Sequence, residues 1–217
     1  MAQEAKRRGR PREYDPDVAL ARATDAFWRG GYAATSLDEL SAATGMHRPS
    51  LYAAFGDKRA LHLKALARYR EETFGRIARG LQTPAPLAES LARVFAEGLA
   101  VFLSGPEGPR GCFALGAALA EAVGDEAVRA EIAEGIAGLD AAFETRFRAA
   151  RAAGETAPDA DPVALARMAT AILHSLAIRA RAGDRREALA QTAAAGVQLL
   201  AGRVRRFPVD PRRPLRD

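Results

Sequence analysis

Residues 35–58 have the sequence TSLDELSAATGMHRPSLYAAFGDK, which contains two short helical patterns with a glycine between them. Ser36 and Glu39 have the spacing of a capping box, in which each side chain satisfies a backbone N–H group at the start of a helix. Gly45 interrupts the first pattern, because glycine tolerates the left-handed conformation at the end of a helix. A second short helix is predicted over residues 47–55. This stretch therefore predicts a helix, a tight turn and another helix.

A longer helix precedes this stretch. It is predicted to follow Asp15, with Pro16 at its first position, and to end at Gly30 and Gly31. Two short helices joined by a glycine-containing turn after a longer helix form a helix-turn-helix motif. A small helical bundle with no role in nucleic-acid binding has the same pattern, so the motif alone does not decide the function.

The rest of the chain is also predicted to be helical, because Ala, Leu, Arg and Glu dominate and runs of β-branched residues are missing. The fold class is therefore all-α, with an N-terminal three-helix domain and a larger C-terminal helical domain. We divide the chain into a disordered basic arm (1–13), a helix-turn-helix domain (14–58), a helical domain (59–205) and a loose tail (206–217). Glycine, proline and Asp-Pro signals place the further helices over residues 58–79, 86–104, 112–123, 125–153, 161–182 and 184–204.

The formal net charge of +5 is concentrated in the first part of the chain. Residues 1–83 contain 15 Lys and Arg against 10 Asp and Glu, whereas the remaining residues contain 17 of each kind. The segment 6–12, KRRGRPR, has no apolar residue to anchor it and is predicted to be disordered alone. Such an arm is narrow enough to enter a DNA minor groove, where negative potential attracts arginine. Arg8, Arg10 and Arg12 are therefore candidate DNA contacts, with a solvated charge run as the alternative.

Several other classes of protein are disfavoured. No run of about 18 uninterrupted apolar residues is present, so no transmembrane helix is expected. The N-terminus lacks the apolar region of a secretory signal, and a cytoplasmic location is expected. The one cysteine and three scattered histidines suggest neither a disulfide nor a metal site. No nucleophile–base–acid set and no phosphate-binding glycine loop is visible, so we expect neither an enzyme nor a bound cofactor.

Residues 15–66 resemble the N-terminal domain of TetR-family transcriptional regulators. The resemblance implies an all-helical homodimer whose N-terminal domains bind successive major grooves of a palindromic operator in double-stranded DNA. It also implies a C-terminal domain for dimerisation and for binding a small-molecule effector, which in most members releases the DNA. The residues that support it, in common order and spacing, are Phe27, Gly31, Tyr32, the capping box, Gly45, Leu51, Tyr52, Phe55 and Lys58.

The second helix of such a motif presents its first turn to base edges in the major groove. Arg48 is the predicted base contact, because its guanidinium group can pair with O6 and N7 of guanine, and a phosphate contact is the alternative. The resemblance matches Tyr52 and Lys58 to phosphate-contacting positions, although Tyr52 is alternatively a core aromatic residue. The remaining candidate DNA contacts are Thr35, Ser36, His47, Pro49 and Ser50.

Apolar residues of the C-terminal domain are candidates for an effector pocket, although plain core packing explains the same spacing. Cys112 is expected to be a small buried residue, because a redox-sensing thiol needs exposure and a depressed pKa. His174 is expected to be a buried, hydrogen-bonded histidine. The candidate pocket residues are Phe95, Leu99, Phe102, Phe113, Phe143, Phe147, Met168 and Ile172.

Small residues in the last two predicted helices permit close approach of a neighbouring helix. The resemblance implies that this pair of helices forms the four-helix bundle of a homodimer, and close packing within one monomer is the alternative. These small residues are Ala166, Ala169, Ala177, Ala190, Ala194 and Gly196.

Together these observations predict a ligand-responsive transcriptional repressor that binds a palindromic operator as a homodimer. An architectural or effector-independent DNA-binding dimer is the alternative. An activator would use the same DNA-binding surface.

Overall fold

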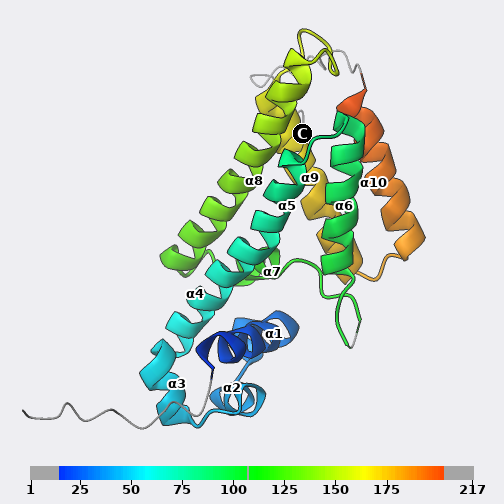
Figure 1. The fold of residues 1–217 in the computed structure, drawn as a ribbon. Coiled ribbons are helices and arrows are strands. Elements are labelled where there is room, and N and C mark those ends of the chain that lie inside the picture. Colours follow the sequence, from blue (N-terminus) through cyan, green and yellow to red (C-terminus); the bar gives the residue numbers. More distant parts are fainter. Residues whose placement is uncertain (1–14, 107, 203–217) are drawn as a thin grey trace, which may run out of the picture. The chain divides into compact units, whose positions relative to one another are not determined.

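The computed structural model describes residues 15–106 and 108–202, and the regular elements of these residues are all helices (Figure 1). The all-α class predicted from the sequence is confirmed. Packing contacts divide the chain into two units, one ending at Leu66 and the other beginning at Ala67. Each unit has its own core and is described separately.

Each helix of the N-terminal unit begins or ends at a local signal in the sequence. The Asp15 carboxylate accepts a hydrogen bond from the backbone N–H of Asp17 at 2.8 Å, which caps the first helix. Ser36 and Glu39 form the predicted capping box, and Gly45 ends the second helix with a φ of 71°. The unit consists of α1 (Pro16–Ala34), α2 (Leu37–Thr44), α3 (Arg48–Phe55) and the first part of α4 (Lys58–Tyr69).

The end of α1 is bent at Gly31, whose φ of 75° lies outside the helical range. A Cβ atom on the preceding Gly30 would lie 2.9 Å from Oγ1 of Thr35, so this close approach requires a glycine. The bend leads the chain from α1 into α2. The core of the unit is formed by apolar side chains from its four helices, which include Phe27, Leu40, Leu51, Phe55 and Leu61.

The first half of α4 belongs to the N-terminal unit because its buried side chains pack there. The His62 ring lies 4.8 Å from the Phe27 ring and 4.9 Å from the Tyr32 ring, measured between centroids. His62 is 1% exposed. The contacts therefore divide the chain after Leu66, eight residues beyond the boundary drawn from the sequence.

The C-terminal unit is a helical bundle in which α8 packs along α9, and α10 packs against α6 and α9 (Figure 1). Phe95, Phe143 and Phe147 are fully buried in its core. Besides the end of α4, the unit contains a π-helical segment (Arg70–Phe74), α5 (Gly75–Gln82), α6 (Leu87–Phe102), α7 (Phe113–Ala120), α8 (Glu126–Ala152), α9 (Pro162–Arg181) and α10 (Arg186–Ala201).

The predicted helix from Lys58 to about Arg79 is present as an unbroken helical path to Gln82, and it contains a π-helical turn at Arg70–Phe74 that the sequence did not predict. This π-helical segment separates α4 from α5 and widens the backbone over a single turn. Arg70 in this segment donates to Glu131 at 2.6 Å and to Glu134 at 2.9 Å, both on α8. Hydrogen bonding to Glu131 is the main reason why the pKa of Arg70 is raised. The ion pairs thus attach the π-helical turn to α8.

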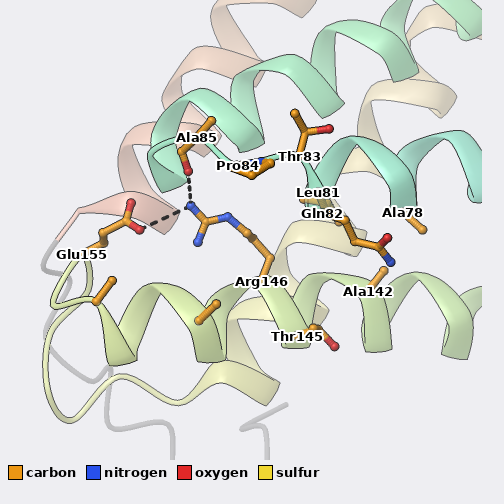
Figure 2. A pocket seen from close by; sticks show the side chains of 12 residues that line it. Ala78, Leu81, Gln82, Thr83, Pro84, Ala85, Ala142, Thr145, Arg146 and Glu155 are labelled. Atoms are coloured by element: carbon orange, nitrogen blue, oxygen red, sulfur yellow. Dashed lines mark hydrogen bonds and ion pairs between the residues drawn. The ribbon is translucent and has the colours of Figure 1, made fainter.

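A network around Arg146 fixes the start of α6 (Figure 2). Arg146 of α8 donates to the backbone carbonyl oxygen of Ala85 at 2.8 Å and lies 3.4 Å from the Glu155 carboxylate. The other carboxylate oxygen of Glu155 accepts from the backbone N–H of Leu87, at the first turn of α6. A groove of about 520 Å³ with an alanine-rich wall lies beside this network. Because its charged groups already satisfy each other, the groove offers no unpaired charge to a ligand.

Glu155→Ala is expected to lower the free energy of unfolding by about 1.5–3 kcal/mol, because it removes the carboxylate partner of Arg146 and leaves the Leu87 N–H group without its acceptor. Urea denaturation monitored by circular dichroism measures this change. The control is Glu144→Ala, which removes a partly exposed carboxylate paired with Arg148 on the outside of α8. The control is expected to cost less than about 1 kcal/mol. Equal losses in the two variants would contradict a stabilising role for the network.

Candidate nucleic-acid interface

The first turn of α3 projects polar groups into solvent. His47, Arg48 and Pro49 are exposed and Ser50 is half-buried. His47 precedes the helix and makes no side-chain capping bond. Pro49 lies in the first turn, where the missing N–H group removes no helical hydrogen bond. The buried side of the same helix contributes Leu51 and Phe55 to the core, so the exposed face is free to enter a groove.

Arg48 is held by an acidic residue that the sequence analysis did not single out. Its Nε donates to Oδ1 of Asp38 at 3.0 Å, and its Nη2 lies 2.5 Å from the same oxygen. Hydrogen bonding to Asp38 raises the pKa of Arg48. Asp38 lies in the first turn of α2, so the pair joins the starts of the two helices of the motif. The spacing of Asp38 and Arg48 in the sequence did not predict this ion pair, because the two residues lie on different helices and not on one helix face.

Tyr52 and Lys58 differ in burial: Tyr52 is exposed, and Lys58 is half-buried. Tyr52 is 46% exposed, which contradicts the alternative that it is a core residue. Lys58 Nζ lies 4.4 Å from the centroid of the Tyr32 ring, in a cation–π contact at the start of α4. Tyr32 therefore positions the lysine, a role that the sequence analysis missed.

Thr35 is placed where it is a poor DNA contact. It is 3% exposed, and its hydroxyl group donates to the Gly31 carbonyl oxygen at 2.7 Å. The prediction of a phosphate contact for Thr35 is therefore corrected, because its hydroxyl stabilises the bend after α1. Ser36 is exposed, and its Oγ accepts from the Glu39 N–H at 3.1 Å. The bonds to Ser36 also lower the pKa of Glu39. The predicted contacts Arg8, Arg10 and Arg12 lie outside the described residues.

The candidate pocket residues of the C-terminal unit belong mostly to its core. Phe95, Phe143 and Phe147 are fully buried, and Leu99, Phe102 and Phe113 are at most 7% exposed. Met168, in contrast, is 55% exposed and cannot line an enclosed cavity. The residues that border the cavities described in this unit do not include any of the eight candidates.

A small cavity instead lies between α7, α8, α9 and the π-helical segment. Its volume is about 10 Å³, room for one water molecule. Its lining is apolar except for Cys112 and His174. The Tyr69 hydroxyl lies 3.3 Å from Sγ of Cys112, and burial raises the pKa of this thiol. The exposure and depressed pKa of a redox-sensing thiol are therefore both missing at Cys112.

Two buried oxygen atoms on α8 and α9, the helices that contribute Ile136 and His174 to this cavity, lack hydrogen-bond partners among the described residues. They are Oδ1 of Asp140 on α8 and Oγ1 of Thr170 on α9, one helical turn before His174. Burial lowers the pKa of His174, and the charge of Asp140 opposes this shift. Helices α8 and α9 thus each contain a buried polar atom that no described residue satisfies. Among the described residues, no group of His, Cys, Asp and Glu is suited to hold a metal ion.

The exposed positions of α9 and α10 include small and apolar residues beside charged and amide ones such as Arg167, Arg179 and Gln191. Four of the six small residues predicted for a dimer interface, Ala166, Ala169, Ala177 and Gly196, pack inside the unit. Ala190 and Ala194 are exposed on α10, together with Leu199. On α9 the exposed face includes Ala164, Met168, Ala171, Ser175 and Ile178. By length and composition α9 could also cross a membrane, but 39% of that stretch is buried in the bundle.

These features define a class of protein: an all-helical regulator with an exposed helix-turn-helix motif and a separate helical unit. Comparison with known families agrees. A profile described as "Bacterial regulatory proteins, tetR family" matches residues 19–65, and one described as "Tetracyclin repressor-like, C-terminal domain" matches residues 89–196.

Individual relatives agree over most of the chain. It is 30% identical over 194 residues to the HTH-type transcriptional repressor ComR of Escherichia coli, covering 89% of this chain and 92% of ComR. It is 32% identical over 160 residues to the uncharacterised regulator YezE of Bacillus subtilis, covering 73% and 82%. A solved structure of the TetR-family regulator CifR with 26 bp operator DNA has a TM-score of 0.79 and 35% identity, covering 87% of this chain and 98% of CifR.

The chain belongs to the TetR family of transcriptional regulators. The resemblance found in the sequence is confirmed, and the match extends through the C-terminal unit. Membership also confirms that the protein is a DNA-binding regulator and not an enzyme.

The shifted pKa of His174 predicts a pH dependence of stability. The folded protein keeps the imidazole neutral at a pH where the unfolded chain, with a pKa near 6.5, takes up a proton. The unfolded state then binds more protons, so the free energy of unfolding falls as the pH is lowered through about 6.5, and this fall ends below the folded-state pKa. Urea denaturation between pH 7.5 and pH 5 is expected to show a shallower fall in His174→Gln than in the wild type. The control His47→Gln, which removes an exposed imidazole, should keep the wild-type slope.

Proposed function

We propose that the protein is a repressor that binds a palindromic operator as a homodimer and is released by a small-molecule effector. The observation that supports DNA binding most directly is the exposed first turn of α3, with Arg48 projecting from it. A helix in the major groove reads bases with side chains of its first turns. Two relatives support this proposal: CifR, whose structure contains operator DNA, and ComR, a transcriptional repressor.

Phosphate contacts are assigned to residues beside the base-reading turn. Tyr52 is exposed on the same helix, and Lys58 is at the N-terminus of α4, where the helix dipole also favours an anion. Ser36 keeps its capping role and His47 and Pro49 lie beside the bases. The basic arm with Arg8, Arg10 and Arg12 is assigned to the minor groove. Among the described residues, these assignments give Arg48 a base contact and Tyr52 and Lys58 phosphate contacts.

The dimer is proposed to form through the exposed faces of α9 and α10. Met168 and Ile178 are each more than half exposed, and Ala171 lies between them on the same face. Small residues between larger apolar ones let two helices approach closely, which suits a self-complementary contact between two copies. Such a contact would cover the apolar stretch of α9.

The effector is proposed to bind where α8 and α9 enclose His174. The small cavity there would have to open by movement of Phe74, which borders it and is part of the π-helical turn that follows α4. An apolar ligand with a hydrogen-bond donor would satisfy Oδ1 of Asp140 or Oγ1 of Thr170. Its binding would act on α4, the helix that continues from one unit into the other. Compounds that raise the Tm of the wild type but not of Asp140→Ala would support this location.

Operator binding is tested by titrating the full chain with the DNA upstream of its own gene and with a shuffled duplex of equal length, at two salt concentrations. A preference for the native duplex, with one dimer per palindrome, is expected. Arg48→Ala is expected to cost about 1–3 kcal/mol at one position of each half-site. Tyr52→Phe should instead weaken all sequences alike, because it removes a phosphate contact. Equal, salt-sensitive binding of both duplexes by the wild type would favour an architectural protein.

Ala171→Glu is expected to convert the dimer to a monomer, because it places two like charges opposite each other in an apolar interface. Sedimentation velocity measures the change, and the affinity for the operator should fall with it. The matched control, Ala141→Glu, adds the same charge to an exposed position of α8. Monomers in both variants, or dimers in both, would contradict the assigned interface.

A further inference from the structure

The geometry of the Arg48–Asp38 pair divides the guanidinium group into two edges. The Nε and Nη2 atoms on one edge both point to Oδ1 of Asp38, at 3.0 and 2.5 Å. The other edge, formed by Nη1 and the second hydrogen of Nη2, faces away from the carboxylate. That second edge has the fork geometry that pairs with O6 and N7 of guanine. The pair therefore uses one edge and leaves the base-reading edge unoccupied by Asp38.

Stability does not explain this pair. The side chains of Arg48 and Asp38 are 53% and 78% exposed. Exposed ion pairs contribute little to folding, because solvent screens them and two flexible side chains must be ordered. Ordering a long arginine in advance does reduce the entropy lost when it binds a target. The ion pair between Arg48 and Asp38 is therefore expected to contribute to DNA binding and not to folding.

The charge of Asp38 also bears on what Arg48 can bind. A guanidinium group already paired with a carboxylate has little net charge to offer a phosphate, and the carboxylate itself repels one. Its remaining N–H groups still donate to uncharged acceptors such as O6 and N7 of guanine. The pair therefore favours a base contact for Arg48 over the alternative phosphate contact.

We propose that Asp38 is a specificity-determining residue, which holds Arg48 with its free edge presented to a guanine in each half-site and disfavours binding of Arg48 to phosphate. This inference rests on the proposed function as an operator-binding protein. Asp38 acts through Arg48 as a positioning residue. Removal of the Asp38 carboxylate is expected to reduce discrimination between bases and to increase the affinity for DNA of unrelated sequence.

The experiment selects bound duplexes from a library with a randomised central region, using the full-length wild type, and then measures the base preference at every position. The same measurement is made on Asp38→Asn, Arg48→Ala and the control Asp25→Asn. The control removes an exposed carboxylate from α1 of the same unit, so it reports the general effect of one lost negative charge. Circular dichroism checks that each variant is folded.

Arg48→Ala is expected to abolish a guanine preference of about tenfold or more at one position of each half-site. Asp38→Asn is expected to lower the preference at that same position by at least about threefold and to raise the affinity for unselected DNA above that of Asp25→Asn. The base preferences at other positions should not change. If Asp38 had only a structural role, its loss would instead alter the preferences at all positions.

Two results would overturn the inference. In one, Asp38→Asn keeps or sharpens the guanine preference that Arg48→Ala abolishes, which would mean that Asp38 is neutral or competes with DNA for the arginine. In the other, Asp38→Asn and Asp25→Asn change the profile alike, so that charge alone accounts for the effect. Failure of the proposed function looks different: the wild type itself would enrich no palindromic sequence.

Discussion

The left-handed turn at Gly45 is the constraint on which the proposed DNA-facing surface depends. A residue with a side chain at this φ of 71° costs about 1–2 kcal/mol more than glycine. The turn ends α2 and leaves two residues before α3 begins, of which Met46 is buried and anchors the connection. Because the crossing of the two helices is set there, Asp38 and Arg48 meet although ten residues separate them. The arrangement of the reading turn thus follows from a backbone conformation.

Sequence predicted the fold well wherever the signal was local. The sequence analysis placed helix starts at or beside residues 15, 36, 125 and 161, and the structure shows capping hydrogen bonds to the side chains of Asp15, Ser36, Asp125 and Asp161. A cap needs only a side chain and the backbone two or three residues ahead, so spacing in the sequence suffices. The order of helices and the motif residues of the family followed from the same local signals.

Sequence failed where the answer depended on which helix packs against which. Thr35 has the polarity of a phosphate contact, but its hydroxyl is used in the bend after α1. Ala166 and Ala194 are the same residue type on neighbouring helices, yet one is buried within the unit and the other is exposed. The π-helical turn at Arg70 is joined by ion pairs to carboxylates of α8 that are about 60 residues away. No periodicity within one helix contains that information.

Two features of the proposed sites contribute little to folding or oppose it. The exposed ion pair of Arg48 and Asp38 contributes at most about 1 kcal/mol. The buried oxygens of Asp140 and Thr170, without partners among the described residues, each cost about 1–3 kcal/mol relative to a satisfied group. Local exceptions to good packing and pairing concentrate at functional sites, where a ligand or partner completes them. In the ion pair, one edge of Arg48 still has N–H groups to donate. The oxygens of Asp140 and Thr170 can still accept hydrogen bonds. A base edge of DNA would accept hydrogen bonds from the free edge of Arg48. An effector that carries a hydrogen-bond donor would satisfy the oxygens of Asp140 and Thr170. The same physical argument therefore distinguishes the proposed DNA-binding surface from the proposed effector site.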